Sequence, residues 1–192
     1  MLPETGAEYK IRFMLRKNVC EIMLDTTGEG LHKRGYRRNA MEAPIRETLA
    51  ATIADLGRVR RDSLVEDPFC GSGTLLIEAA QKAMNIAPGL KRRFAAERYG
   101  FVPAAVWAEQ RQKALADSKL DVGFEAFGYD IDPAAVALAN ANAKLAGVEK
   151  RCHFEVADVA DFAAKSEAIV LTNPPYGERM STCLLYTSDA AD

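Results

Sequence analysis

The chain has 192 residues, 48% of them apolar, which is enough for one ordinary domain with a real core and a smaller additional fragment. Its net charge of −2 excludes a global field that would draw the chain to nucleic acid, so any such binding must depend on local basic patches. Its four cysteines are widely scattered, which argues against a zinc site or a disulfide framework, and no apolar run could cross a bilayer, so we expect a cytoplasmic protein.

The first third of the chain predicts a β-hairpin, a basic linker and a helix. Short apolar runs at 9–15 and 19–24 flank a polar turn, which is typical of a hairpin. A two-stranded hairpin is marginal in isolation, so we expect it to belong to a larger module. Residues 31–38 are a basic linker, and helical spacing begins at Pro44 and ends at Gly57. The expected buried face of this helix comprises Ile45, Leu49, Thr52, Ile53 and Leu56.

Strands and helices then alternate to the end of the recognisable pattern. We expect strands at 64–67, 124–129, 152–156 and 168–171, and helices at 74–84, 103–119 and 132–146. Such alternation predicts a parallel, doubly wound α/β sheet, which we expect to be incomplete after its fourth strand. Residues 85–102 interrupt it as an irregular basic segment. The string 183–192 resembles translated sequencing-adapter sequence, so we interpret residues 181–192 as a non-native tail; the alternative is a native helix start cut short.

Gly71 and Gly73 lie between the first of these strands and the helix that follows it. Glycines allow a tight turn and bring backbone N–H groups close to a ligand at a helix N-terminus. In a doubly wound sheet this loop lies at the edge where ligands bind. The loop lacks the G-x-G-x-x-G pattern, so a nicotinamide cofactor is disfavoured. We expect a cradle for another nucleoside cofactor, although such a turn can also serve packing alone.

Carboxylates follow three of the predicted strands. Asp130 ends the second strand and is placed to accept hydrogen bonds from both ribose hydroxyls, while Asp132 is expected to cap the next helix. Asp158 follows the third strand and could accept from an adenine amino group, or could be a turn residue with Asp161 as its competitor. Asp67 ends the first strand and could face an amino group of the cofactor, or could only orient the loop.

The tetrapeptide Asn173-Pro174-Pro175-Tyr176 closes the fourth strand. The Asn173 side-chain carbonyl and the Pro174 backbone carbonyl can accept both protons of a planar amine, and the two prolines stiffen the loop that carries them. Tyr176 can stack on an extruded base. With the glycine loop, this pattern indicates methyl transfer from S-adenosylmethionine to an exocyclic nitrogen of a nucleobase. No metal, general base or covalent nucleophile is required, and the plain alternative is a proline turn.

These motifs, in this order, resemble those of class I S-adenosylmethionine-dependent methyltransferases, particularly the bacterial THUMP-domain RNA guanine-N2 methyltransferases that modify 23S ribosomal RNA. The resemblance covers about residues 8–180. It implies a Rossmann-like fold in which residues 1–30 are the remnant of a THUMP RNA-binding module, 31–43 a basic linker and 44–180 a truncated methyltransferase domain. The expected cofactor-binding residues are Asp67, Phe69, Gly71, Gly73, Thr74, Asp130, Ile131, Asp158 and Asn173, and the expected catalytic residues are Asn173, Pro174 and Tyr176.

The expected partner is RNA, with large-subunit ribosomal RNA as the substrate. Two basic clusters are candidates for binding its phosphates, although each could be ordinary solvated surface. They comprise Lys33, Arg34, Arg37 and Arg38, and Lys91, Arg92 and Arg93. The alternative functions are methylation of adenine N6 in DNA or RNA, methylation of glutamine in a protein, and cofactor or RNA binding without turnover, because the tetrapeptide recognises only an NH₂ group.

Overall fold

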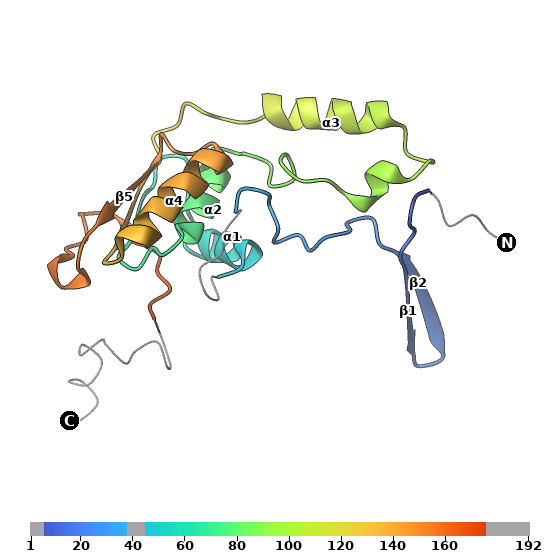
Figure 1. The fold of residues 1–192 in the computed structure, drawn as a ribbon, viewed down its shortest axis with the longest axis horizontal. Helices are drawn as coiled ribbons and strands as arrows, with labels where there is room; N and C mark the ends of the chain where they lie inside the picture. Colours follow the sequence, from blue (N-terminus) through green and yellow to red (C-terminus); the bar gives the residue numbers. More distant parts are fainter. Residues whose placement is uncertain (1–5, 38–44, 176–192) are drawn as a thin grey trace.

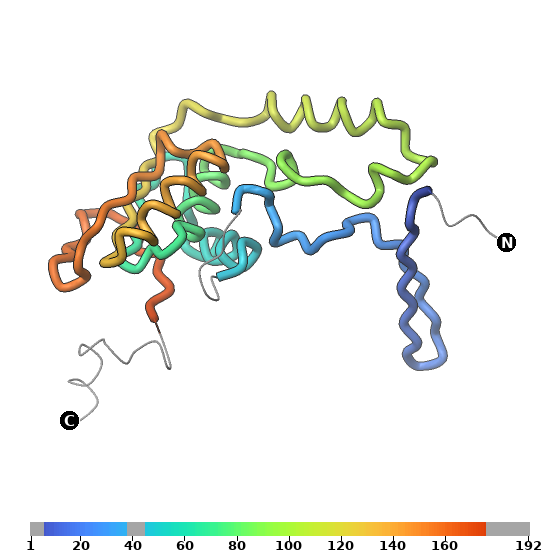
Figure 2. The backbone as a smooth tube through the Cα atoms, viewed as in Figure 1, coloured from blue at the N-terminus to red at the C-terminus, as the bar shows by residue number. Residues whose placement is uncertain are grey.

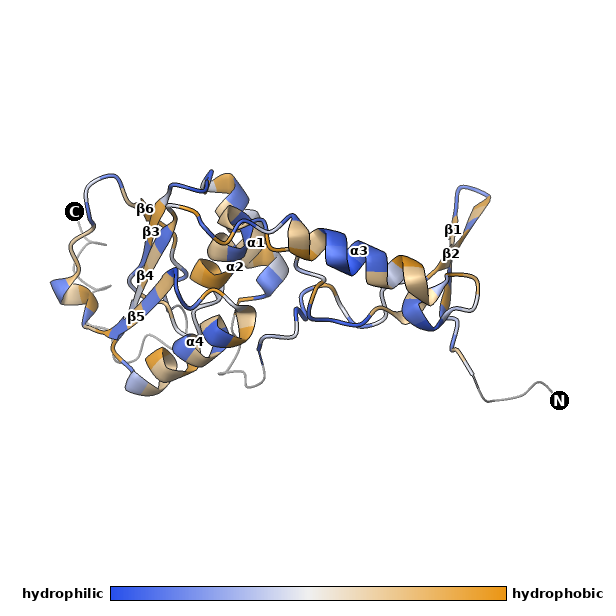
Figure 3. Ribbon diagram, turned by 90° about the horizontal axis from the view of Figure 1, so that it is seen from above, coloured by the Kyte–Doolittle hydropathy of each residue, from blue (hydrophilic) through white to orange (hydrophobic). Residues whose placement is uncertain are grey.

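The computed structural model describes residues 6–37 and 45–175 (Figure 1). Its main body is a parallel sheet of four strands in the order β5-β4-β3-β6. The strands are Leu64–Asp67 (β3), Glu125–Asp130 (β4), Cys152–Val156 (β5) and Ile169–Val170 (β6). Helices Glu47–Leu56 (α1), Thr74–Ala83 (α2) and Pro133–Ala146 (α4) lie on the same side of the sheet (Figure 3). The predicted parallel α/β sheet is confirmed.

Small side chains let the helices approach the sheet closely. On β4, Ala126 and Gly128 share the face of the sheet that meets the helices. The ring of Phe154 fills the space above Gly128, where a Cβ atom would lie only 2.6 Å from the ring. On the helices, Ala80 and Ala139 are completely buried. Helix α4 begins and ends as predicted, because the Asp132 carboxylate accepts from the Ala134 amide and Gly147 adopts a left-handed conformation.

The predicted buried face of α1 is confirmed only for Ile53, which packs against the core, and is wrong for Leu49, Thr52 and Leu56. Leu49 and Leu56 are 52% and 78% exposed, whereas Glu47, Ala50 and Ala54 are buried. Helix α1 packs on α2 through its alanines, which permit a closer approach than leucine would. The buried Glu47 carboxylate pairs with Arg37 of the linker, so the helix is rotated toward an ionic partner that the apolar spacing could not reveal.

The predicted hairpin is confirmed and projects away from the sheet (Figures 1 and 2). Strands Ile11–Arg16 (β1) and Val19–Leu24 (β2) are antiparallel, and every residue of both strands is exposed. Its register places six apolar side chains on one face, because residues directly opposite in an antiparallel pair share a face. They are Ile11, Phe13, Leu15, Cys20, Ile22 and Leu24.

The basic segment 85–102, which lies between α2 and β4 in the sequence, is hydrogen-bonded to the residues that follow the hairpin. It contains a 3₁₀ turn at Ala95–Arg98 and leads to helix Ala104–Ala116 (α3). The buried Arg92 guanidinium donates to the backbone oxygens of Gly30 at 2.9 Å and Glu29 at 2.5 Å. The Tyr99 hydroxyl donates to the Asp25 carbonyl at 2.5 Å. No described helix is long and apolar enough to span a membrane.

Replacement of Arg92 by methionine should release the segment between the hairpin and the linker, because three carbonyl oxygens there lose their guanidinium donor. We expect limited proteolysis near residues 25–31 to be faster than in the unmodified chain. The matched control is Arg93→Met, since the Arg93 side chain is 92% exposed and forms only a 3.5 Å ion pair with Glu97. Equal proteolysis of the two variants would contradict the bracing role of Arg92.

Candidate active site

The strand order reverses at β3, which places several loops at one edge of the sheet. Going along the chain, β4 is added beside β3 and β5 beside β4, so the sheet grows in one direction. The next strand, β6, instead pairs with the opposite side of β3. In open α/β sheets, ligands bind outside the carboxyl ends of the strands at such a switch point. The glycine loop after β3 and the Asn173-Pro174-Pro175 turn after β6 both begin at this edge.

Asp67 and Thr172 connect these two loops directly. The Leu171 amide donates to the Glu66 carbonyl at 2.9 Å, which continues the pairing of β3 with the chain beyond β6. One residue further along each segment, the Thr172 side chain lies beside the Asp67 carboxylate and acts to lower its pKa. Asn173 follows immediately and is exposed, while Pro174 and Pro175 are partly buried. The two motifs therefore begin on adjacent chain segments at the same edge of the sheet.

The Asp67 carboxyl group is only 2% exposed and has an unusual acidity. Burial, with a smaller contribution from the nearby Asp130 carboxylate, raises its pKa to about 7. The Phe69 amide, which donates to Oδ1 at 3.0 Å, and the Thr172 side chain oppose this effect. A buried acid that titrates near neutrality at this edge would be stabilised in its ionised form by a cationic ligand group.

The glycine loop is held by hydrogen bonds from separate parts of the chain. The Gly71 amide donates to Asp130 Oδ2 at 2.9 Å, and the Asn142 side-chain amide of α4 donates to the Ser72 carbonyl at 3.0 Å. Gly71 and Gly73 have φ values of 51° and 77°, a left-handed conformation that glycine adopts without strain. A Cβ atom on Gly71 would meet no atom within 4 Å, so the backbone there faces open space.

The other predicted cofactor residues occupy different positions around this edge. Asp130 is partly buried, and its Oδ1 accepts from the Asp132 amide, but a carboxylate has lone pairs left for a ligand. Ile131 is 68% exposed, and Phe69 is partly buried. The Asp158 carboxylate accepts from the Ala160 amide at 2.9 Å, which is the turn role that the sequence left open for it.

Thr74 and Cys70 are both buried. The buried Thr74 hydroxyl accepts from Arg37 at 2.5 Å and contacts the Ser72 hydroxyl at 3.1 Å, so the predicted direct cofactor contact of this side chain is not supported. Burial raises the pKa of the Cys70 thiol, and the neighbouring Asp67 carboxylate adds to the effect. This agrees with the prediction that Cys70 is no nucleophile. Within the part of the chain that the structure describes, no cluster of His, Cys, Asp or Glu could hold a metal ion.

The predicted basic clusters divide into internal and surface residues. Arg34 lies 3.3 Å from the Glu78 carboxylate, Arg37 pairs with Glu47, and Arg92 is buried against backbone oxygens. The structure thus contradicts a phosphate-binding role for these three arginines, because their guanidinium groups already serve acceptors within the protein. The exposed members are Lys33, Lys91 and Arg93. Arg38, Tyr176 and Gly177 lie outside the described residues.

Sequence analysis missed Ser72 and Asn142. Asn142 is 1% exposed on the face of α4 that also buries Ala139 and Ala143. A polar residue on an otherwise apolar helical face was the available signal, because a buried amide requires a partner. That partner, the Ser72 carbonyl, is separated from Asn142 by 70 residues of sequence, so the pairing itself could not be read from local spacing.

A comparison with family models matches residues 34–184 to the RMKL-like methyltransferase domain. The chain belongs to this family. Its fold is that of class I S-adenosylmethionine-dependent methyltransferases, as predicted. The match covers most of the linker, the glycine loop and the Asn173-Pro174-Pro175 turn together.

Similar proteins include YpsC of Bacillus subtilis, 42% identical over 93% of this chain and 47% of YpsC. The ribosomal RNA large subunit methyltransferase K/L of Shewanella baltica is 44% identical over 91% of this chain and 25% of that protein. The crystal structure of SMU.472 in complex with S-adenosylhomocysteine (SAH) is 42% identical over 92% of this chain and 46% of that one, with a TM-score of 0.83. A Listeria monocytogenes structure, named as a predicted N6-adenine-specific DNA methylase, is 43% identical over 92% of this chain and 47% of that one, with a TM-score of 0.86. The chain thus spans about half the length of YpsC and about a quarter of the Shewanella protein.

The two glycines of the loop should respond differently to replacement by alanine. Both variants must place an alanine in a left-handed conformation, at a cost of roughly 1–2 kcal/mol each. At Gly73 the new Cβ would also lie 2.8 Å from the Phe154 ring and 3.1 Å from Ala139, whereas at Gly71 it would meet nothing. We expect Gly73→Ala to lower the free energy of unfolding by more than Gly71→Ala in urea denaturation. Equal losses would show that the ring yields without cost.

Proposed function

We propose that the chain carries the catalytic site of an enzyme that transfers a methyl group from S-adenosylmethionine to the exocyclic N2 amine of guanine in RNA, with large-subunit ribosomal RNA as the substrate. The observation that carries this proposal is the meeting of the glycine loop and the Asn173-Pro174-Pro175 turn across Asp67 and Thr172. A methyl donor held by the first loop would lie beside an amine held by the second.

The residues at the switch point fit such a cofactor chemically. The ionised Asp67 carboxylate would accept from the methionine ammonium group, directly or through a water molecule. The open backbone at Gly71 leaves room for the ligand, and Asp130 would accept from the ribose hydroxyls. Ile131 presents an exposed apolar side chain suited to the adenine ring, and Asp158 retains acceptor capacity for the adenine amine. The bound cofactor supplies the electrophilic methyl group.

The Asn173 turn would position the nucleophile. An exocyclic amine is a weak nucleophile because its lone pair is delocalised into the base. The Asn173 side chain and the Pro174 carbonyl can accept its two protons and favour the tetrahedral geometry that develops as the N–C bond forms. The sulfonium C–S bond breaks as this bond forms, and one amine proton then leaves to water. Stacking of Tyr176 on an extruded base remains part of the proposal.

RNA and guanine are the preferred substrate and base for two reasons. The Shewanella relative is named for ribosomal RNA, and the motifs of this chain resemble those of guanine-N2 enzymes. We further propose that the hairpin is the end of an RNA-binding THUMP module, because its exposed apolar face requires a larger body to cover it. Adenine N6 is the second candidate, since the similar Listeria structure carries that name and adenine presents the same NH₂ group.

Two substitutions should separate chemistry from cofactor binding. Asn173→Ala removes an amine acceptor and should abolish methyl transfer while leaving SAH affinity close to that of the unmodified protein. Asp130→Ala should weaken SAH binding first, because the carboxylate also holds the Gly71 amide. The measurements are methyl incorporation into RNA and calorimetric titration with SAH.

The same incorporation assay tests the substrate. It compares ribosomal RNA, duplex DNA and a release-factor protein under identical conditions, with nucleoside analysis of the modified RNA. Detection of N2-methylguanosine in RNA supports the proposal. Detection of N6-methyladenine or of methylated protein would contradict it and favour the corresponding alternative. Equal loss of transfer and SAH affinity in Asn173→Ala would contradict the role assigned to that side chain.

Asp67→Asn should show opposite effects on stability and on cofactor binding. A pKa raised on folding means that the acid contributes stability at low pH and loses this contribution as the pH rises from the ordinary value of 3.8 to about 7. The neutral asparagine avoids this loss, so the melting temperature of the variant should exceed that of the unmodified chain by more at about pH 8 than at about pH 5. Its SAH affinity should nevertheless be lower at about pH 8, because the ammonium group loses its ionic partner. A stability difference independent of pH would contradict the buried titration of Asp67.

A further inference from the structure

Arg37 of the basic linker is held inside the protein at the start of α2. Its side chain is 13% exposed, and its Nη2 atom donates to the Ile45 carbonyl at 3.1 Å and to the Thr74 hydroxyl at 2.5 Å. Its Nε atom lies 3.7 Å from the Glu47 carboxylate of α1. Thr74 is the first residue of α2 and follows the glycine loop directly. Arg37 therefore joins the linker and α1 to the end of the loop.

The contact extends from Thr74 into the loop. The Thr74 hydroxyl lies 3.1 Å from the Ser72 hydroxyl, and the Asn142 side chain of α4 holds the Ser72 carbonyl at 3.0 Å. Ser72 is thus fixed from two directions, by the linker through its side chain and by α4 through its backbone. The Gly71 amide is fixed separately by Asp130.

The loop needs such distant contacts because its local sequence provides little to fix it. Gly73 occupies the N-cap position of α2 without a side chain to cap the helix, and the first turn of α2 contains no acidic residue. Two glycines with positive φ give the unrestrained loop many alternative conformations. Contacts such as those from Arg37, Asn142 and Asp130 offset this freedom.

A cation at this position is unfavourable on general grounds. The N-terminus of a helix carries a partial positive charge, so a guanidinium group beside it is disfavoured unless an anion compensates. The buried Glu47 carboxylate provides this compensation. The Arg37–Glu47 pair holds the rigid guanidinium group, with its five N–H donors, against Thr74. A shorter or uncharged side chain in place of Arg37 would not do this.

We infer that Arg37 is a positioning residue for the cofactor site: it fixes the glycine loop through Thr74 and Ser72 and so couples the linker to cofactor affinity. The inference rests on the proposed binding of S-adenosylmethionine at that loop. Arg37 acts through the loop and touches neither the methyl group nor the base.

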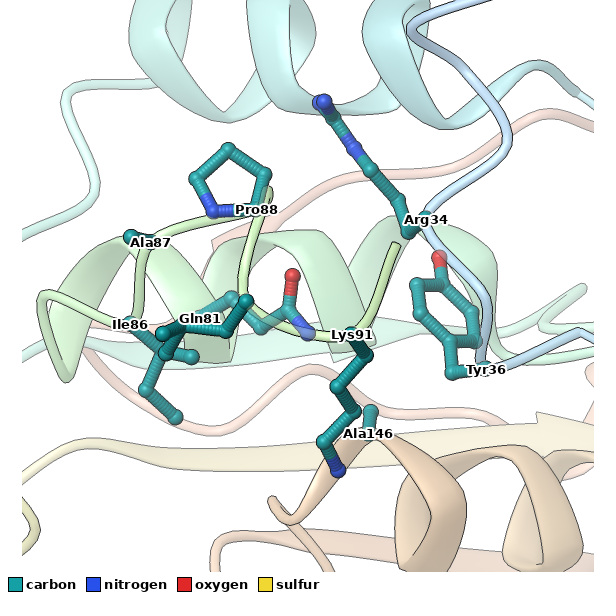
Figure 4. A pocket seen from close by; sticks show the side chains of 9 residues that line it. Arg34, Tyr36, Gln81, Ile86, Ala87, Pro88, Lys91 and Ala146 are labelled. Carbon is teal, nitrogen blue, oxygen red and sulfur yellow. The ribbon is translucent and has the colours of Figure 1, made fainter. Parts of the chain in front are cut away.

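Tyr36 provides a matched control on the same linker. It is 1% exposed, and its hydroxyl donates to the Glu78 carboxylate of α2 at 3.0 Å. Glu78 lies one turn beyond Thr74. Tyr36 also lines a small pocket, together with residues that include Arg34, Gln81 and Lys91 (Figure 4). Tyr36→Phe therefore removes a buried bond between the linker and α2 without touching the glycine loop.

The experiment compares Arg37→Met, Thr74→Val and Tyr36→Phe with the unmodified chain by calorimetric titration with SAH and by thermal unfolding. We expect Arg37→Met and Thr74→Val each to weaken SAH binding about tenfold, and the double variant to weaken it no further than Arg37→Met alone, because both break one contact. Tyr36→Phe should lower the melting temperature while changing SAH affinity less than about twofold. Arg37→Lys, which restores one donor, should recover part of the affinity.

Hydrogen exchange of the Gly71–Thr74 amides provides a readout that needs no ligand. Exchange should be faster in Arg37→Met and in Thr74→Val and unchanged in Tyr36→Phe. Unchanged exchange and SAH affinity in Thr74→Val, or losses of affinity that merely follow the melting temperature in all variants, would overturn the inference. If the unmodified chain bound no SAH while exchange still responded as expected, the proposed cofactor would fail and the bracing of the loop by Arg37 would stand.

Discussion

The pairing of β6 with the free side of β3 is the constraint on which the rest of the site depends. A parallel strand added instead to the free side of β5 would leave β4 and β5 between the Asn173-Pro174-Pro175 turn and the glycine loop. Pairing with β3 instead brings Thr172 to Asp67 and places a stiff, proline-bounded turn next to a loop made flexible by glycine. The sheet thus sets the distance between the two motifs before any side chain contributes.

The two loops at this edge are stabilised in different ways. Consecutive prolines restrict the Asn173 turn through covalent geometry, so it needs few outside contacts. The glycine loop has no such restriction and depends on Asp130, Asn142 and Arg37, which come from β4, α4 and the linker. The conformation of the glycine loop consequently depends on contacts from several parts of the domain, whereas the prolines of the Asn173 turn restrict its conformation locally.

The strands, the glycine loop and the acids at the strand ends could be predicted because their signals are local. An apolar run closed by Asp67 or Asp130 indicates both the strand and the position of the carboxylate, and the switch-point rule then brings them together. The face of α1 could not be predicted in this way, because it is decided by alanine contacts and by the pairing of Glu47 with Arg37. Likewise, Arg34 and Arg92 resemble solvated cations until their partners, Glu78 and the carbonyls near Gly30, are known.

The hairpin has a consequence for the behaviour of this polypeptide in solution. Its six-residue apolar face is open to water, with Phe13 and Ile22 79% and 75% exposed. Among residues 6–37 and 45–175, each strand of the hairpin pairs only with the other, which leaves one backbone edge of each unpaired. Unpaired edges beside such a face are templates for intermolecular strand addition. Concentrated samples of the chain should therefore self-associate through residues 11–24. Light scattering would show this self-association as an apparent molar mass that increases with protein concentration.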